Sequence, residues 1–172
     1  ESRMERELEL TPVEKPAGAN TDEWEWFAAL AGKITYSSAE VFSVTFEGSL
    51  YAREGLRPEN CLFAYNFDRK TGNLLSFDDL YVIDDALYTA FAEGGKKAIL
   101  EENGGTWPEA VGEFSEELCS RDAFEKGLAK DVKSDRVWWF YTEDGITFSY
   151  PVLYALGCHK EAAVPSSALV SK

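Results

Sequence analysis

Side chains suited to catalysis are scarce in this sequence of 172 residues, which contains one histidine and three cysteines. The single imidazole, His159, follows Gly157 and Cys158 in a segment that we predict to be a loop. Nucleophilic catalysis requires a base held next to the nucleophile, and structural zinc sites combine several Cys and His ligands. We therefore interpret His159 as a surface histidine, and we predict no catalytic residue, no metal site and no cofactor.

The three cysteines, Cys61, Cys119 and Cys158, are far apart in the chain. None of them lies in a CxxC or Cys/His metal-binding spacing. Their number allows either one disulfide with a free thiol or three buried thiols.

Carboxylates are the remaining candidates for chemistry, because the chain has 31 Asp and Glu residues. A glycosidase needs two acids about 5 to 10 Å apart in a cleft. The pairs Asp78-Asp79 and Asp84-Asp85 stand at expected helix starts, where carboxylates cap the helix and face its positive end. We interpret these four residues as capping residues, and we keep a carboxylate-dependent glycan hydrolase as an alternative.

The formal net charge of −14 limits the classes of partner. Such a surface repels phosphate, which argues against nucleic-acid binding and against docking on anionic lipids. It permits attraction to a cationic protein. No apolar run is long enough for a membrane helix, so we expect no direct membrane insertion of this fragment. The chain starts at Glu1 rather than Met, which favours a trimmed or mature fragment.

The pattern of apolar residues predicts one domain over residues 1–172, with an N-terminal strand and helix in residues 1–32. Residues 4–10 alternate as in a strand, and 11–19 form a loop. A helix is expected from Asn20 to Gly32, because Trp24, Phe27, Ala28 and Ala31 are spaced as one helical face.

The rest of the chain predicts strands grouped on either side of helices. This order favours an α+β fold, an antiparallel sheet with helices packed on one face. Adjacent residues of a strand point to opposite faces, so one of Trp138 and Trp139 is expected in the core. The expected strands are 33–36, 41–51, 61–68, 137–141, 146–150 and 161–164; the turns are 69–72 and 143–145; the loop is 151–157; and the helices are 84–103, capped by Asp84 or Asp85, and 121–129, capped by Ser120.

Two segments carry a family pattern. The stretch from Tyr65 to Tyr81 reads YNFDRKTGNLLSFDDLY, and that from Trp139 to Phe148 reads WFYTEDGITF, followed by a loop and then Ala163-Val164-Pro165. Over residues 33–170 the chain resembles the extracytoplasmic domain shared by RsiV-type anti-sigma factors and the non-catalytic part of PdaC-type peptidoglycan deacetylases.

The resemblance implies an antiparallel sheet flanked by helices, export to the cell envelope and no cofactor. RsiV-type members of the family are lysozyme receptors. The family usually has a Gly-Gly-Ala-His stretch where this chain has REGLRP at residues 53–58, so the contacts of that loop must differ.

Our leading hypothesis is therefore a non-catalytic extracytoplasmic binding or sensor domain for lysozyme or a cell-wall glycan. The alternatives are a structural or assembly module without a small ligand, and the glycan hydrolase. The candidate contact residues are Arg53, Glu54, Arg57, Trp107, Trp138 and Trp139.

Overall fold

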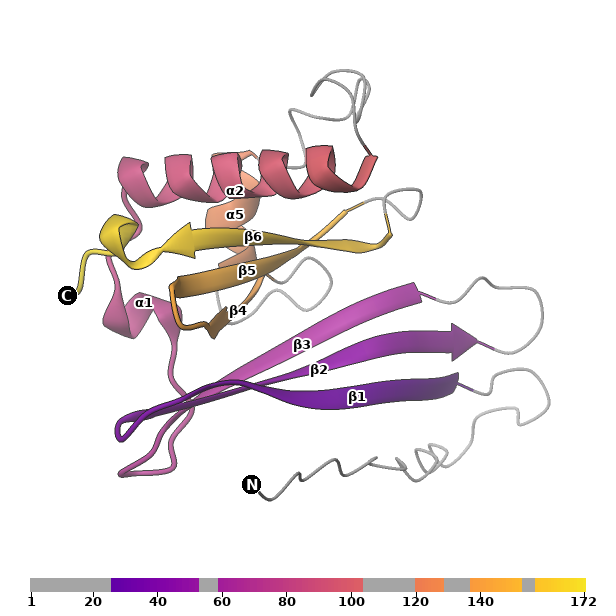
Figure 1. Cartoon of the computed structure of the whole chain (residues 1–172), viewed down its shortest axis with the longest axis horizontal. Coiled ribbons are helices and arrows are strands. Elements are labelled where there is room, and N and C mark those ends of the chain that lie inside the picture. The colour runs from indigo at the N-terminus through magenta and orange to yellow at the C-terminus, as the bar shows by residue number, and fades with distance from the viewer. Residues whose placement is uncertain (1–25, 53–58, 104–119, 129–136, 153–156) are drawn as a thin grey trace.

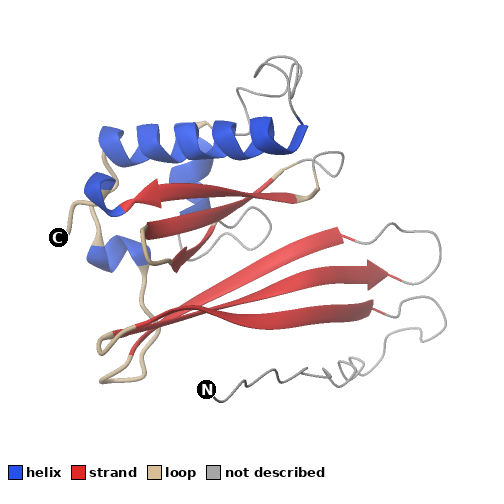
Figure 2. Ribbon diagram, in the orientation of Figure 1, coloured by secondary structure: helices blue, strands red, loops and turns tan. Residues whose placement is uncertain are grey.

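The computed structural model describes residues 26–52, 59–103, 120–128, 137–152 and 157–172. These residues form two antiparallel sheets of three strands each, together with a few helices (Figure 1). The α+β class predicted from the sequence is confirmed, and the strands divide between two sheets rather than forming one. The long helix after the first sheet lies on the side of the second sheet that faces away from the first (Figure 2).

The first sheet is a meander of β1 (Trp26–Ser37), β2 (Val41–Ala52) and β3 (Glu59–Asp68). Its strands alternate between two faces, as period-two patterning requires. The face with Ser43, Thr45 and Asn66 is buried. The opposite face carries pairs of aromatic rings, including Phe46 beside Tyr65.

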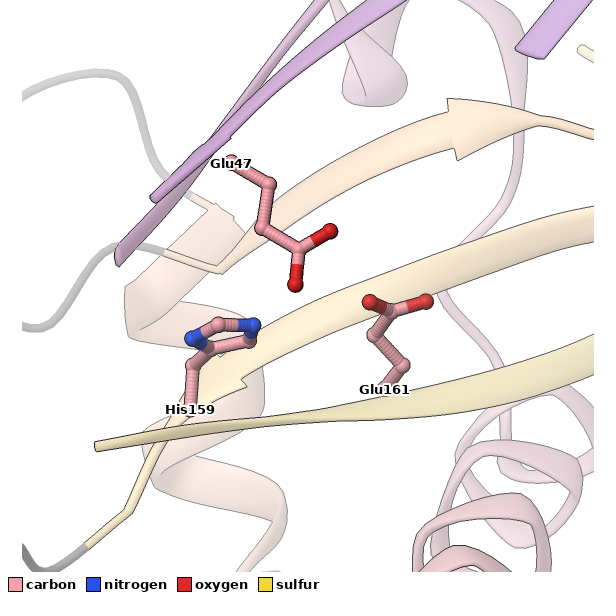
Figure 3. A group of neighbouring side chains, drawn as sticks. All are labelled: Glu47, His159 and Glu161. Carbon is pink, nitrogen blue, oxygen red and sulfur yellow. The ribbon is translucent and has the colours of Figure 1, made fainter. Parts of the chain in front are cut away.

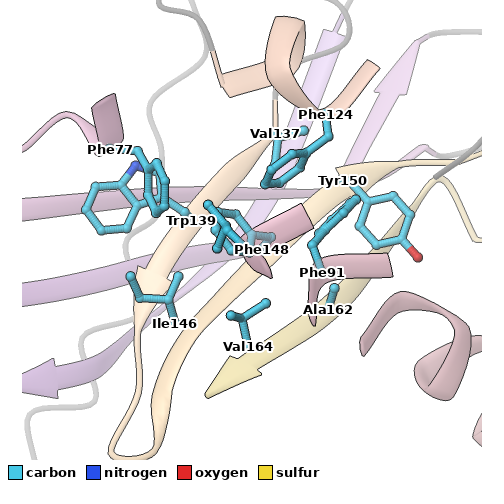
Figure 4. Close-up of a cluster of buried hydrophobic side chains, with 11 residues drawn as sticks. Phe77, Phe91, Phe124, Val137, Trp139, Ile146, Phe148, Tyr150, Ala162 and Val164 are labelled. Carbon is cyan, nitrogen blue, oxygen red and sulfur yellow. The ribbon is translucent and has the colours of Figure 1, made fainter. Parts of the chain in front are cut away.

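The second sheet consists of β4 (Trp138–Tyr141), β5 (Gly145–Pro151) and β6 (His159–Pro165), in that order. The helices are α1 (Phe77–Leu80), α2 (Asp85–Asn103) and α5 (Arg121–Leu128), with a short 3-10 helix, η3 (Ser166–Ala168). The main core lies between this sheet and the helices, where Phe91 of α2 stacks on Phe124 of α5 over Phe148 of β5 (Figure 4).

A buried polar network joins the two sheets. The Asn66 amide nitrogen donates to the Trp139 carbonyl at 2.7 Å, and the Asn66 amide oxygen accepts from the Ser43 hydroxyl at 2.6 Å. The backbone N–H of Tyr141 in turn donates to the Ser43 hydroxyl at 3.1 Å. Ser43 and Asn66 belong to the first sheet, whereas Trp139 and Tyr141 belong to β4 of the second. The network therefore fixes the position of β4 against β2 and β3.

The predicted helix from Asn20 to Gly32 is wrong over residues 26–32, which belong to β1. These residues pair with β2 from Trp26 opposite Ala52 to Gly32 opposite Phe46. Their apolar spacing fits a helix, but hydrogen bonding along a twelve-residue neighbouring strand outweighs that local preference. Residues 4–25, with the predicted first strand and loop, lie outside the described part of the chain.

Most other local predictions are confirmed. Asp84 caps α2 by accepting from the Leu87 N–H at 2.9 Å, and Ser120 caps α5 by accepting from the Ala123 N–H at 3.3 Å. The turn after Asp68 closes on Gly72, whose φ of 75° suits glycine. One boundary was placed too late, because β6 begins at His159, and this residue therefore belongs to a strand rather than a loop.

No helix in the described ranges is both long and apolar enough to span a bilayer.

Candidate functional site

A cavity of about 270 Å³ opens where the edge strand of each sheet meets α1. β3 is the outer strand of the first sheet and β4 is the outer strand of the second, so neither is covered by a further strand of its own sheet on this side. The end of α5 closes the cavity at Leu128. The lining residues are Ala64, Tyr65, Asn66, Leu74, Leu75, Ser76, Phe77, Asp79, Leu128, Val137, Trp138 and Trp139.

Aromatic rings form one wall of this cavity. The half-buried Trp138 makes edge-to-face contacts with Phe63 and Tyr65, at ring-centroid distances of 5.4 and 5.6 Å. Leu74, which is 61% exposed, adds an apolar surface beside it. Aromatic rings held in this way present a rigid apolar face at little entropic cost to a ligand.

Asn66, Ser76 and Asp79 are polar residues of the cavity lining. Asn66 has its amide groups committed to Trp139 and Ser43. The Ser76 hydroxyl donates to the Asp78 carboxylate. Asp79 is exposed and is the one carboxylate among the described lining residues. The cavity therefore combines aromatic surface with polar groups, and such polar groups fix the orientation of a ligand.

Two of the six candidate contact residues from the sequence line this cavity, namely Trp138 and Trp139. They point to opposite faces of β4, as predicted. Trp139 packs in the main core against Phe77 at a centroid distance of 5.3 Å, whereas Trp138 packs on the first sheet. The other four, Arg53, Glu54, Arg57 and Trp107, lie outside the described residues.

Sequence reasoning missed Tyr65, Asp79 and Leu74 as lining residues. Along β3, Tyr65 stands between the buried residues Ala64 and Asn66. The alternation of side chains in a strand therefore indicated only that Tyr65 lies on the opposite face. Asp79 was interpreted as a capping residue; it lies in the first turn of α1, but the N-cap is Ser76 and the helix has no side-chain capping hydrogen bond. Only the placement of β4 against β3 brings these side chains together.

Two tyrosines away from the cavity are linked by a hydrogen bond. The hydroxyls of Tyr81 and Tyr141 are 3.0 Å apart. Burial, and next the bond to Tyr81, raise the pKa of Tyr141 above its ordinary value. Tyr141 is therefore a neutral structural group at physiological pH, and it ties β4 to the segment after α1.

The described cysteines, Cys61 and Cys158, are partly buried. The Cys61 thiol lies 3.7 Å from the Gly48 carbonyl oxygen, and Cys158 has a φ of 72° in the turn before β6. Both are free thiols, which contradicts a disulfide between them, and Cys119 lies outside the described part.

The sequence matches no protein-family profile and no curated protein. A DUF3298 family protein from Bacteroides fragilis has a similar structure, with a TM-score of 0.51 and 18% identity over 86% of this chain and 55% of that one. This similarity shows a shared fold. A second DUF3298 family protein, from Pseudomonas aeruginosa, gives a TM-score of 0.48 and 18% identity over 87% of this chain and 62% of that one. The chain thus spans less than two thirds of the length of either protein.

Proposed function

We propose that this chain is a non-catalytic extracytoplasmic binding domain, and that the cavity beside Trp138 holds a sugar unit of a cell-wall glycan. The observation that carries the proposal is the aromatic wall of Trp138 and Tyr65 next to the exposed carboxylate of Asp79. The apolar face of a sugar ring packs on an aromatic ring, and its hydroxyl groups donate to a carboxylate such as that of Asp79. The resemblance of the chain to the RsiV and PdaC extracytoplasmic domain supports the choice of ligand and compartment.

The distribution of acids in the cavity supports binding rather than hydrolysis. Glycoside hydrolysis uses two carboxyl groups on either side of the scissile bond, about 5 to 10 Å apart. Among the described residues that line the cavity, Asp79 supplies one carboxylate. A single carboxylate is sufficient to orient a sugar hydroxyl.

The test is calorimetric titration of the purified chain with soluble muropeptides. We expect saturable binding that weakens at least tenfold in Asp79→Asn and in Trp138→Phe, because the first loses charge and the second loses ring area. Asp144→Asn is the matched control, since Asp144 is exposed in the β4–β5 turn, away from the cavity lining. Far-UV circular dichroism checks that each variant folds. Equal binding by all four proteins, or none by the wild type, would contradict the proposal.

A cationic protein such as lysozyme is the second candidate ligand, and the net charge of −14 favours it. Electrostatic attraction of this kind accelerates association and weakens as ionic strength rises. Titration with lysozyme at 20 and 300 mM NaCl tests this ligand. Binding that falls with salt and is indifferent to Trp138→Phe would favour lysozyme over a glycan in the cavity.

A further inference from the structure

Three potential metal ligands converge between the two sheets, away from the cavity. Glu47, His159 and Glu161 each offer one ligand atom, and these atoms all lie within 4.8 Å of one another. Glu47 belongs to β2 of the first sheet, and the other two belong to β6 of the second. Figure 3 shows the Glu47 carboxylate directed toward the imidazole and toward Glu161.

Strand periodicity places the three side chains on facing surfaces. On β6, Ala162 and Val164 point into the main core, so His159 and Glu161 point to the opposite face. On β2, Ser43 and Thr45 are buried on the face that is turned toward the second sheet, and Glu47 continues the same alternation. The convergence is therefore built into the two strands and does not depend on a loop.

Charges in this cluster are incompletely balanced. Neither Glu47 nor Glu161 makes an ion pair with another described residue. His159, and next Lys33 on β1, attract Glu161 without forming an ion pair with it. Glu47 and Glu161 are exposed residues, and they face each other across the gap between the sheets.

The Nδ1 atom of His159 is buried and has no hydrogen-bond partner among the described residues. Buried polar atoms without a partner are rare in folded proteins, so this imidazole is a group that a ligand can still engage.

We propose that Glu47, His159 and Glu161 bind one divalent cation of the zinc class, which bridges the two sheets. One imidazole with two carboxylates suits Zn²⁺ better than Mg²⁺ or Ca²⁺, which prefer oxygen ligands alone. Zinc takes such ligands at about 2.0 to 2.2 Å, so the side chains need small rotations to close on it, and three protein ligands leave a fourth position for water. The site is independent of the sugar proposal, because none of its residues lines the cavity.

The experiment is calorimetric titration of the metal-free chain with ZnCl₂ at pH 7. We expect one saturable site whose affinity falls at least tenfold in Glu47→Gln, in His159→Gln and in Glu161→Gln. The loss in Glu47→Gln is decisive, because this residue is contributed by the other sheet. Titration with MgCl₂ is expected to give at least tenfold weaker binding.

Two control variants separate this site from other zinc ligands. Glu143→Gln removes an exposed carboxylate in the β4–β5 turn, and Cys158→Ser removes the thiol next to His159. Both are expected to bind zinc like the wild type, with unfolding temperatures confirming that they fold. Loss of binding in Cys158→Ser, unchanged affinity in Glu47→Gln and Glu161→Gln, or no saturable binding up to 1 mM would each overturn the proposal.

Discussion

At the scale of single residues, Asn66 is the polar side chain on which the contact between the sheets depends most. It is 2% exposed, and it joins the Trp139 carbonyl of one sheet to the Ser43 hydroxyl of the other. A buried group that loses its partner costs about 1 to 3 kcal/mol.

We therefore expect Asn66→Ala to lower the free energy of unfolding by about 2 to 3 kcal/mol, since it leaves the Trp139 carbonyl without this donor. Urea unfolding followed by circular dichroism measures the change. Asn60→Ala is the matched control, because the Asn60 amide oxygen accepts an exposed hydrogen bond from Ser49 on the same sheet. A loss below 0.5 kcal/mol in Asn66→Ala would show that the network is not needed to hold the sheets together.

Glu161 gives a prediction about pH. Burial, and next the charge of Glu47, raise the pKa of Glu161 in the folded chain. The folded state then holds the proton more tightly than the unfolded state, so the stabilisation is present at low pH and is lost as pH rises through the raised pKa.

In metal-free protein at pH 7, Glu161→Gln is thus expected to be more stable than the wild type, by about 0.5 kcal/mol, the scale of partly exposed charge pairs. The difference should disappear at pH 3.5, where the carboxyl group is protonated in both states. Thermal unfolding in the presence of a chelator, at both pH values, measures it. An equal difference at the two pH values would mean that packing rather than charge distinguishes the variant.

At the scale of elements, two glycines of α2 allow this helix to pack closely on β6 and on the Tyr150 side chain of β5. Gly94 and Gly95 weaken an isolated helix by about 1 kcal/mol each relative to alanine. A Cβ atom at Gly94 would lie 2.6 Å from the Ala163 carbonyl oxygen, and one at Gly95 would lie 2.7 Å from the Tyr150 hydroxyl oxygen. The close approach of helix and strand therefore requires residues that helix propensity disfavours.

Gly94→Ala is accordingly expected to destabilise the protein by about 1 to 3 kcal/mol, the usual cost of overpacking, although alanine is the better helix former. Thr89→Ala, at an exposed position of the same helix, is the control and should change stability by less than about 0.5 kcal/mol. Chemical unfolding of the two variants provides the comparison. A Gly94→Ala protein more stable than the wild type would show that α2 can move away from β6 without cost.

Local patterns predicted most elements because their determinants lie within a few residues. The alternation in β2 and β3, the cap at Asp84 and the turn at Gly72 are all of this kind. Residues 26–32 of β1 were mistaken for a helix because the spacing of Phe27, Ala28 and Ala31 fits one helical face, and only pairing with β2 overrides that local pattern.

The sites were less predictable for the same reason. The alternation of side chains along a strand predicted that Trp138 and Trp139 face opposite ways. It did not predict that Tyr65 and Asp79 complete a cavity beside them. The prediction of no metal site rested on a single histidine, and no local pattern connects Glu47 with His159. Both proposed sites depend on the way the second sheet packs on the first, which is a contact between distant parts of the chain.

At the scale of the whole molecule, the charge of −14 opposes the compact state. Like charges repel more strongly when the chain is folded, and added salt screens this repulsion, with a Debye length of about 30 Å at 0.01 M and 8 Å at 0.15 M. We expect the unfolding temperature at pH 7 to rise by several degrees when NaCl increases from 10 to 150 mM, as scanning calorimetry can measure.

At pH 4.5, near the isoelectric point, the same salt step should have little effect, because the net charge is close to zero. An equal rise at both pH values would assign the stabilisation to a general effect of salt on hydration, and a fall at pH 7 would mean that attractive ion pairs outweigh the repulsion among the acids.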